Sequence, residues 1–458
     1  MPAMKVSVVI LAAGQGKRMK SDLPKVLQPL AGRPLLKHVI DVAQSLEPAS
    51  VQVVYGYGGE RVREALKDEQ VSWVLQAEQL GTGHAVLQAA PDLADDQLAL
   101  VLYGDVPLIR RSTLEELVKL AGADALGLLT MVVDDPTGYG RIVRSTRGQV
   151  QKIVEQKDAS KAQLKIRECN TGVLVAPVKR LKRWLGLLTN DNTQREYLLT
   201  DIIAMAVEDK VKVNPLVAPT ASEVLGVNDK AQLAELEALR RAQVNRELML
   251  AGVTLADPAR VDVRGTLTHA SDVFIDVNVV FEGRVSLGNR VRIGPNCVIR
   301  DAHIGDDTQV HGHCFIDSAT IGADCSIGPF ARFRPSSTLT DSVHIGNFVE
   351  VKNSTMGDGS KANHLAYVGD ATVGARVNIG AGTIIANYDG ANKHRTTIGD
   401  DVHTGSNSVL VAPITVGQGA TIGAGSTVAN QVPAGKLTVA RARQTTIEGW
   451  ERPRKQKK

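Results

Sequence analysis

Apolar residues recur every five or six positions through most of the C-terminal half of the chain. The members of this pattern are Leu287, Ile293, Ile299, Ile304, Val310, Ile316, Ile321, Ile327, Phe333, Ile345, Val351, Val373, Ile379, Ile398, Thr404, Leu410, Val416, Ile422 and Val428. The period fits neither an α-helix nor the alternation of an ordinary strand. It predicts the hexapeptide repeat of a parallel β-helix, in which three hexads form one triangular coil and the apolar side chain points inward.

Glycine, aspartate and asparagine are expected at the corners of each coil, where the backbone needs a positive φ. The repeat is interrupted at residues 351–367 and again near 386–397. We interpret both segments as insertions at corners, and such loops commonly carry function. Coils of this kind recur in acyltransferases, so acyl transfer is a candidate activity.

The N-terminal residues follow a different pattern, in which apolar strands alternate with amphipathic helices. The predicted strands are 6–11, 51–55 and 98–102, and the predicted helices are 34–46, 59–66, 83–90 and 112–120. This order is typical of a doubly wound, Rossmann-like α/β domain.

One long helix is predicted between the two patterns, since residues 230–251 are rich in Ala, Leu, Glu and Arg without Gly or Pro. We therefore expect a doubly wound α/β domain at 1–229, a helical linker at 230–251, a β-helix domain at 252–441 and a basic tail at 442–458.

Composition sets limits on the partners. Aromatic residues make up only 3% of the 458 residues, as a narrow prism of aliphatic side chains would explain, and the net charge of +4 is mild. Much of that charge lies in the tail, which we interpret as a solvated end rather than a nucleic-acid-binding arm. No basic patch interleaved with aromatic residues occurs elsewhere, so no nucleic acid partner is expected.

The four cysteines, Cys169, Cys297, Cys314 and Cys325, form no CxxC pair. We interpret them as buried apolar side chains in a reducing compartment. The apolar run at 6–13 is too short to span a bilayer and leads into a glycine loop, so neither a signal peptide nor membrane insertion is expected, and we predict a cytoplasmic protein.

The glycine loop at 11–25 has the sequence LAAGQGKRMKSDLPK. Gly14 and Gly16 allow the backbone N–H groups to approach a phosphate, and Arg18 and Lys25 add positive charge. The spacing is not the GxxxxGK[ST] of a P-loop. It is not GxGxxG either, because a methionine holds the last position, so the two glycines alone are weak evidence for nucleotide binding.

The whole loop is more specific, because it resembles the sugar nucleotidyltransferase signature LxxGxGTRMxxxLPK, with Lys17 in place of the usual threonine. Further segments match in the same order at 76–84, 102–107, 135–142, 153–155, 170–172 and 226–228. Over essentially its full length the chain resembles the family of bifunctional N-acetylglucosamine-1-phosphate uridyltransferases and glucosamine-1-phosphate N-acetyltransferases.

The resemblance implies that the N-terminal domain couples N-acetylglucosamine 1-phosphate to UTP and releases pyrophosphate. Two anions must meet in such a transfer, so positioning and charge neutralisation dominate and a divalent cation is expected. Asp105 and Asn228 are the implied Mg²⁺ ligands. Arg18 and Lys25 are the implied catalytic cations. The other implied contacts with UTP or the UDP-sugar are Leu11, Ala12, Ala13, Gly14, Gln76, Gly81, Thr82, Tyr103, Gly104, Gly140, Glu155 and Asn170, the last three on the sugar and the segment around Gln76 on the uracil.

The resemblance further implies that the β-helix domain acetylates glucosamine 1-phosphate with acetyl-CoA. His364 is the implied general base, and a histidine suits that task because its ordinary pKa lies near neutral pH. The implied contacts are Arg334, Lys352, Tyr367, Asn378, Asn387 and Tyr388 with the sugar phosphate, and Ala381, Ser406, Ala424 and Arg441 with acetyl-CoA. The Ala381 N–H is a candidate oxyanion donor. A left-handed β-helix, a homotrimer with shared acetyl sites, and supply of peptidoglycan and lipopolysaccharide precursors follow from the same resemblance.

Three alternatives stay open. The repeat domain could be only an oligomerisation platform of a nucleotidyltransferase, or the whole chain could be a scaffold that is not an enzyme. The intact Gly loop, Lys25 and Asp105 argue against the scaffold, and Lys352 and His364 argue against the platform. The segment His311-Gly-His-Cys314 could hold zinc, but zinc needs three or four convergent ligands and no further cluster is evident nearby.

Overall fold

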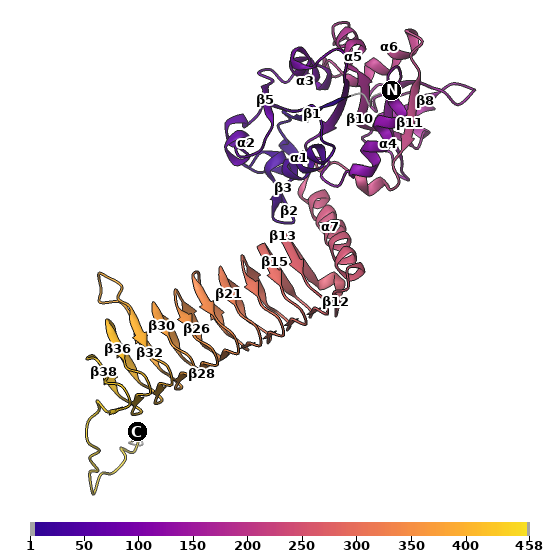
Figure 1. Cartoon of the computed structure of the whole chain (residues 1–458). Coiled ribbons are helices and arrows are strands. Elements are labelled where there is room, and N and C mark those ends of the chain that lie inside the picture. Colours follow the sequence, from indigo (N-terminus) through magenta and orange to yellow (C-terminus); the bar gives the residue numbers. More distant parts are fainter. Residues whose placement is uncertain (1–4, 456–458) are drawn as a thin grey trace. The chain divides into compact units, whose positions relative to one another are not determined.

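The computed structural model describes residues 5–455, and the chain divides into two compact units, Met1–Arg240 and Arg241–Lys458 (Figure 1). The division falls inside the long helix Lys230–Leu250 (α7), so each unit holds part of the predicted helical linker. The domain boundaries expected from the sequence stay predictions.

The first unit is built on a nine-stranded mixed sheet whose main order is β11-β7-β10-β6-β1-β4-β5. Its strands are Val6–Ala12 (β1), Ser50–Tyr55 (β4), Ser72–Leu75 (β5), Leu98–Tyr103 (β6), Leu126–Val132 (β7), Arg141–Arg144 (β8), Val150–Val154 (β9), Glu168–Pro177 (β10) and Val213–Val217 (β11), beside the small pair Pro29–Leu30 (β2) and Arg33–Pro34 (β3). The three strands predicted from the sequence run parallel, as expected. Strand β10 runs antiparallel to both neighbours, which the alternation of strands and helices did not indicate.

Helices cover both faces of this sheet. They are Leu35–Ser45 (α1), Gly59–Ala65 (α2), Thr82–Ala89 (α3), Arg111–Ala121 (α4), Val178–Leu185 (α5) and Ile202–Glu208 (α6). Buried residues of α1, α2 and α4 pack with Val8 and Ile10 on one face. Those of α3, α5 and α6 pack with Val9 and Leu11 on the other face. The doubly wound α/β prediction is therefore confirmed.

The second unit is a parallel β-helix made of an eleven-stranded and a seventeen-stranded sheet. The first contains Thr254–Leu255 (β12), Phe274–Ile275 (β14), Arg292–Ile293 (β16), Gln309–Val310 (β19), Ser326–Ile327 (β22), His344–Asn347 (β25), Lys361–His364 (β28), Asn378–Ile379 (β31), His403–Thr404 (β34), Thr421–Ile422 (β37) and Leu437–Thr438 (β39). The second contains Val261–His269 (β13), Val279–Leu287 (β15), Val298–Arg300 (β17), His303–Ile304 (β18), Phe315–Asp317 (β20), Ala319–Ile321 (β21), Arg332–Phe333 (β23), Ser337–Leu339 (β24), Glu350–Lys352 (β26), Thr355–Met356 (β27), Tyr367–Gly369 (β29), Ala371–Val373 (β30), Ile384–Ala386 (β32), Thr396–Ile398 (β33), Val409–Val411 (β35), Ile414–Val416 (β36) and Thr427–Val428 (β38).

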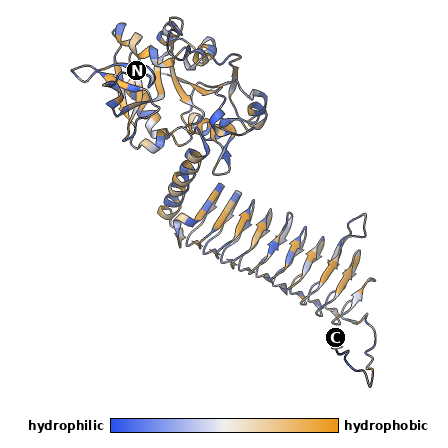
Figure 2. Cartoon of the chain, turned by 180° about the vertical axis from the view of Figure 1, so that it is seen from behind, coloured by the Kyte–Doolittle hydropathy of each residue, from blue (hydrophilic) through white to orange (hydrophobic). Residues whose placement is uncertain are grey.

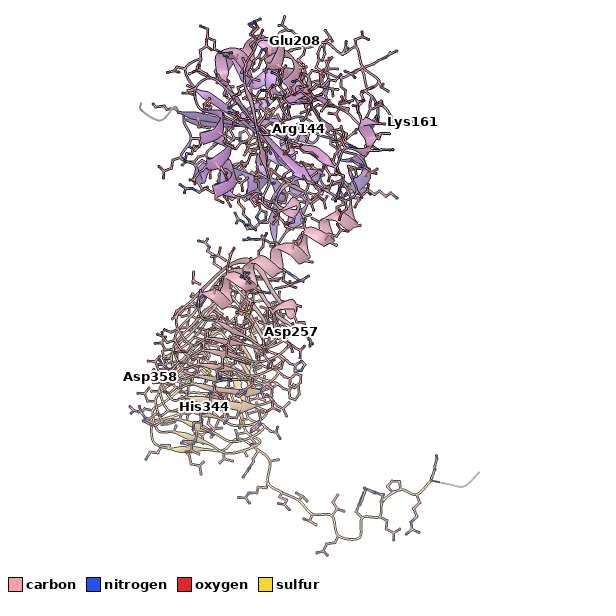
Figure 3. All side chains as sticks on the ribbon, turned by 90° about the vertical axis from the view of Figure 1, so that its right-hand side faces the viewer. Arg144, Lys161, Glu208, Asp257, His344 and Asp358 are labelled. Carbon is pink, nitrogen blue, oxygen red and sulfur yellow. The ribbon has the colours of Figure 1, made fainter. Side chains whose placement is uncertain are left out.

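The predicted three-hexad coil is confirmed by the register. Gln309 pairs with Ser326, 17 positions further on, and Ser326 pairs with His344, 18 positions further on. Every apolar residue of the six-residue pattern is buried in one continuous core, apart from Thr404, which is buried as a polar side chain. Figure 2 shows hydrophobic residues recurring from coil to coil, while Figure 3 shows polar side chains such as His344 and Asp358 on the outside.

One predicted insertion is wrong. Across 351–367 the register is unbroken, since His344 pairs with Lys361 at 17 positions. The inward-facing positions of the repeat continue at Met356 and Ala362, which are both buried. A search for Ile, Val and Leu at these positions does not detect them. The insertion near 386–397 is confirmed, because Ala371 pairs with Thr396, 25 positions further on.

The corners accept larger residues than expected. Phe330 and Phe348 have φ of 58° and 57°, and their exposed rings stack at a centroid separation of 5.3 Å. His313 extends the stack at 4.8 Å from Phe330. Packing between equivalent corners of successive coils therefore compensates for a backbone conformation that usually favours glycine or asparagine.

All four cysteines are buried and free. Residues 442–455 hold no helix or strand and are exposed, and residues 456–458 of the predicted basic tail lie outside the described residues. Among the residues that the structure describes, no helix is both long and apolar enough to cross a bilayer.

Candidate functional site

A cleft of about 400 Å³ opens at the carboxyl ends of β1 and β6 in the first unit. Ligands of open α/β sheets bind at this position, because loops from neighbouring strands diverge there. The lining residues are Leu11, Ala12, Ala13, Gly14, Gln15, Lys25, Val26, Gln76, Gln79, Gly81, Thr82, Ala85, Tyr103, Asp105 and Glu196. Most of the residues predicted to hold the nucleotide thus surround one cleft. Glu196 was not predicted, and no motif marks it in the sequence.

The two predicted metal ligands converge at one edge of this cleft. Asp105 forms an ion pair with Lys25, and Lys25 Nζ also donates to Asn228 Oδ1 at 3.0 Å. Arg18 donates to the same Asn228 oxygen at 2.8 Å. The Val227 N–H donates to the Asp105 carbonyl at 3.0 Å, which holds the two distant segments together. All four predicted charged or polar groups therefore meet, although 210 positions separate Arg18 from Asn228.

A divalent cation fits this donor set, since a carboxylate and an amide oxygen are hard ligands of the kind that Mg²⁺ prefers. Both oxygens contact the Lys25 ammonium and Asn228 also contacts the Arg18 guanidinium, so a cation that reached them would meet two charges of like sign.

The segment predicted to read the uracil follows β5. Gln76 is 3% exposed, and its Nε2 donates to the Gly81 carbonyl at 3.1 Å. Gly81 has φ 120°, and a Cβ there would lie 2.5 Å from the Tyr197 carbonyl, so only glycine is tolerated. The Thr82 hydroxyl accepts from the Leu199 N–H at 3.0 Å, which anchors the first turn of α3.

The predicted sugar-side residues lie next to Tyr103. The Asn170 N–H donates to the Gly140 carbonyl at 2.9 Å, and a Cβ on Gly140 would lie 3.4 Å from Glu155 Oε1. Burial raises the pKa of Glu155, although a hydrogen bond of 3.2 Å from Thr200 opposes the shift. Burial, together with the carboxylates of Asp105 and Glu155, also raises the pKa of Tyr103.

His364 occupies a corner of the β-helix at the end of β28 and not a loop insertion. Its side chain is exposed, and Nδ1 lies 3.1 Å from Asn347 Oδ1, one coil earlier. The predicted acetyl-CoA residues follow at the same corner. The His364, Ala381 and Ser406 carbonyls accept from the N–H groups of Gly382, Asn407 and Gly425, and the Ala424 carbonyl accepts from Arg441 Nη1 at 2.6 Å.

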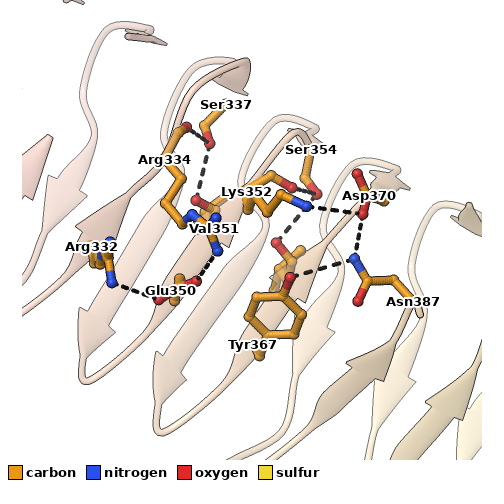
Figure 4. Close-up of polar contacts among 11 residues, drawn as sticks. Arg332, Arg334, Ser337, Glu350, Val351, Lys352, Ser354, Tyr367, Asp370 and Asn387 are labelled. Atoms are coloured by element: carbon orange, nitrogen blue, oxygen red, sulfur yellow. Dashed lines mark hydrogen bonds and ion pairs between the residues drawn. The ribbon is translucent and has the colours of Figure 1, made fainter. Parts of the chain in front are cut away.

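Three of the predicted sugar-phosphate residues, Lys352, Tyr367 and Asn387, lie around Asp370, which the sequence did not single out (Figure 4). Lys352 Nζ lies 3.4 Å from Asp370 Oδ2, Asn353 donates to the other oxygen at 2.6 Å, and Asn387 donates to Oδ2. Burial alone would raise the pKa of Asp370, but these donors hold it below its ordinary value. Asn387 also lies 3.4 Å from the Tyr367 hydroxyl.

More cationic charge surrounds this cluster. Arg334 pairs with Glu350 at 3.1 Å, and the neighbouring Lys352 ammonium lowers the pKa of Lys393 in the loop insertion. Lys393 was not predicted either, because nothing in the sequence places that loop beside Lys352. Asn378 lies on β31, and the exposed Tyr388 bonds the Gly390 carbonyl, so neither contacts Asp370 within the described residues.

Comparisons with known proteins cover nearly the whole chain. The model of the MobA-like NTP transferase domain matches residues 8–243, the model of the GMPPB C-terminal domain matches 263–346, and the bacterial transferase hexapeptide model matches 395–430. The bifunctional protein GlmU of Aromatoleum aromaticum is 60% identical over 452 residues, which cover 99% of both chains. That of Azoarcus sp. is 60% identical over 99% of this chain and 100% of its own, and that of Cupriavidus pinatubonensis is 58% identical over the same shares.

The chain belongs to the bifunctional GlmU family. Membership confirms the expectation of an enzyme that combines uridylyltransferase with glucosamine-1-phosphate acetyltransferase activity. The platform and scaffold alternatives are set aside. Family models place a nucleotidyltransferase in the first unit and a hexapeptide-repeat transferase in the second.

The described residues offer no ligand set for the zinc alternative. Within residues 5–455, no group of three or more His, Cys, Asp or Glu side chains is arranged to hold a metal. His311 bonds Ser326 at 3.3 Å, and His313 stacks on Phe330. These side chains therefore make contacts between neighbouring coils.

Proposed function

We propose that the first unit transfers the uridylyl group of UTP to N-acetylglucosamine 1-phosphate with Mg²⁺, at the cleft around Asp105, and that the second unit first acetylates glucosamine 1-phosphate with acetyl-CoA. The convergence of Lys25, Arg18, Asp105 and Asn228 carries the first assignment. Mg²⁺ bound there neutralises charge between the two anionic reactants. Arg18 and Lys25 orient the phosphates, while Gly140, Glu155 and Asn170 bind the sugar.

The acetyl site is supported by two groups of side chains. Arg334, Lys352 and Lys393 provide cations for a sugar phosphate, and His364 provides a base next to the backbone ladder of Ala381. The Ala381 N–H is suited to stabilise the oxyanion formed on the acetyl carbonyl. The product supplies precursors for cell-wall and lipopolysaccharide synthesis.

A test of both activities uses one purified protein. Acetyl-CoA and glucosamine 1-phosphate should release free thiol, and UTP with the acetylated sugar phosphate and Mg²⁺ should release pyrophosphate. If only one of the two products is released, the function proposed for the inactive unit is wrong.

The acetyl site is completed, in this proposal, by further copies of the chain in a homotrimer. His364 and Asp370 lie on different corners of one coil, and six residues of extended chain span roughly 20 Å at about 3.3 Å per residue. A second copy that brings its own His364 to the Asp370 cluster would join base and cations at one substrate. Closed rings of this kind are usual for symmetric oligomers.

Mixed oligomers test this sharing. Lys352→Ala and His364→Ala should each abolish acetyl transfer, and co-expression should restore about a quarter of wild-type turnover, because one site in four then receives both intact side chains from different chains. Separately purified proteins mixed without subunit exchange serve as the control. If oligomers shown to contain both variants recover no acetyl transfer, Lys352 and His364 of each site come from the same chain.

A further inference from the structure

His84, on helix α3, contacts Gln76, whose segment is predicted to read the uracil. The Gln76 amide nitrogen lies 3.1 Å from the Gly81 carbonyl and 3.0 Å from His84 Nδ1. On its other side, His84 Nε2 lies 3.1 Å from Gln88 Nε2. Gly81, Gln76 and His84 thus form one chain of hydrogen bonds.

One backbone group fixes the direction of this chain. The Gly81 carbonyl can only accept, so the NH₂ end of the Gln76 amide must face it. The second hydrogen of that NH₂ group points to His84 Nδ1, which therefore accepts. A neutral imidazole has one N–H, so the hydrogen lies on Nε2, and it bonds Gln88 only when that amide turns its oxygen toward the ring.

The remaining polar atom of Gln76 is Oε1. It receives no hydrogen bond from any residue of 5–455, and Gln76 lines the cleft. A buried amide with both hydrogens engaged presents a fixed acceptor to a ligand. A nucleobase that offers an N–H at that edge pairs with it, and a base that offers a lone pair is repelled.

We propose that His84 is a positioning residue that holds the Gln76 amide with its oxygen toward the cleft and thereby selects uracil over cytosine. Uracil carries an N–H at N3, whereas cytosine carries a lone pair there. This inference rests on the proposed uridylyl transfer. His84 itself touches no substrate and acts only through Gln76.

The test compares kcat/KM for UTP and CTP on the same preparations. His84→Ala removes the second acceptor, so the amide loses one of its two restraints, and the UTP/CTP ratio should fall about tenfold, the value of one net hydrogen bond. His84→Asn places Oδ1 near the position of Nδ1, and its ratio should stay within about threefold of wild type. A packing defect alone would lower both nucleotides equally and leave the ratio unchanged.

Leu87→Ala is the matched control, because Leu87 lies on the same helix and lines the same apolar hollow as His84 without touching Gln76. Its ratio should equal that of wild type. An unchanged ratio in His84→Ala, or a loss in His84→Asn as large as in His84→Ala, would overturn the role of His84. A wild-type protein that does not use UTP at all would instead overturn the proposed function.

Discussion

His364→Ala lowers acetyl transfer by about 10²- to 10⁴-fold and leaves uridylyl transfer unchanged. The magnitude is that of a general base that takes a proton from an attacking amine. Asn347 Oδ1 lies 3.1 Å from Nδ1 and can accept its hydrogen, which leaves the Nε2 lone pair available to the amine. Thiol release under saturating substrates measures the loss, and the ascending limb of its pH profile should vanish in the variant.

His344→Ala is the control for this change, since His344 is an exposed histidine on β25, whose register partner on β28 is Lys361. It should leave both activities and the pH profile as in wild type. Near-normal turnover of folded His364→Ala with an unaltered limb would remove His364 from the mechanism.

Asp105→Ala should lower uridylyl transfer by at least about 10²-fold and spare acetyl transfer. The variant loses a carboxylate from the metal site and leaves the Lys25 ammonium without its ion-pair partner. Pyrophosphate release measures the loss, and thiol release from the same sample reports on the other unit.

Two further variants keep this prediction specific. Asp105→Asn keeps an oxygen donor but loses the charge, so it should need more Mg²⁺ for half-maximal rate. Asp95→Ala removes an exposed carboxylate that pairs with Lys182, and it should change neither activity. Equal loss of both activities in folded Asp105→Ala would contradict independent sites.

The fold was predictable where one residue type repeats with a fixed period. Ile293, Ile299 and Ile304 share one environment, so the periodicity alone indicates the coil. The same search failed at Met356 and Ala362, because the prism accepts any apolar side chain when neighbouring coils compensate in volume. Strand β10 was missed since its direction depends on pairing with β6 and β7, which no local pattern encodes.

The candidate site was predictable as a set of residues and not as a set of contacts. The loop motif and the resemblance singled out Lys25 and Asp105, but their ion pair joins segments 80 positions apart. Asp370 and Lys393 were missed because aspartate is ordinary at a corner and lysine is ordinary in a loop. Only the stacking of coils makes them neighbours of Lys352.

The regular register of the β-helix has a thermodynamic consequence. Each coil exchanges hydrogen bonds only with the coils before and after it, so its stability is a sum of nearest-neighbour couplings along one dimension. A terminal coil has one such coupling instead of two and frays at a lower free energy than a central coil. Ala424 and Arg441 belong to the last coils, whereas His364 lies several coils further in. The proposed contacts with acetyl-CoA therefore lie in the coils that unfold most readily. Bound acetyl-CoA would stabilise these coils, as a further neighbouring coil would do.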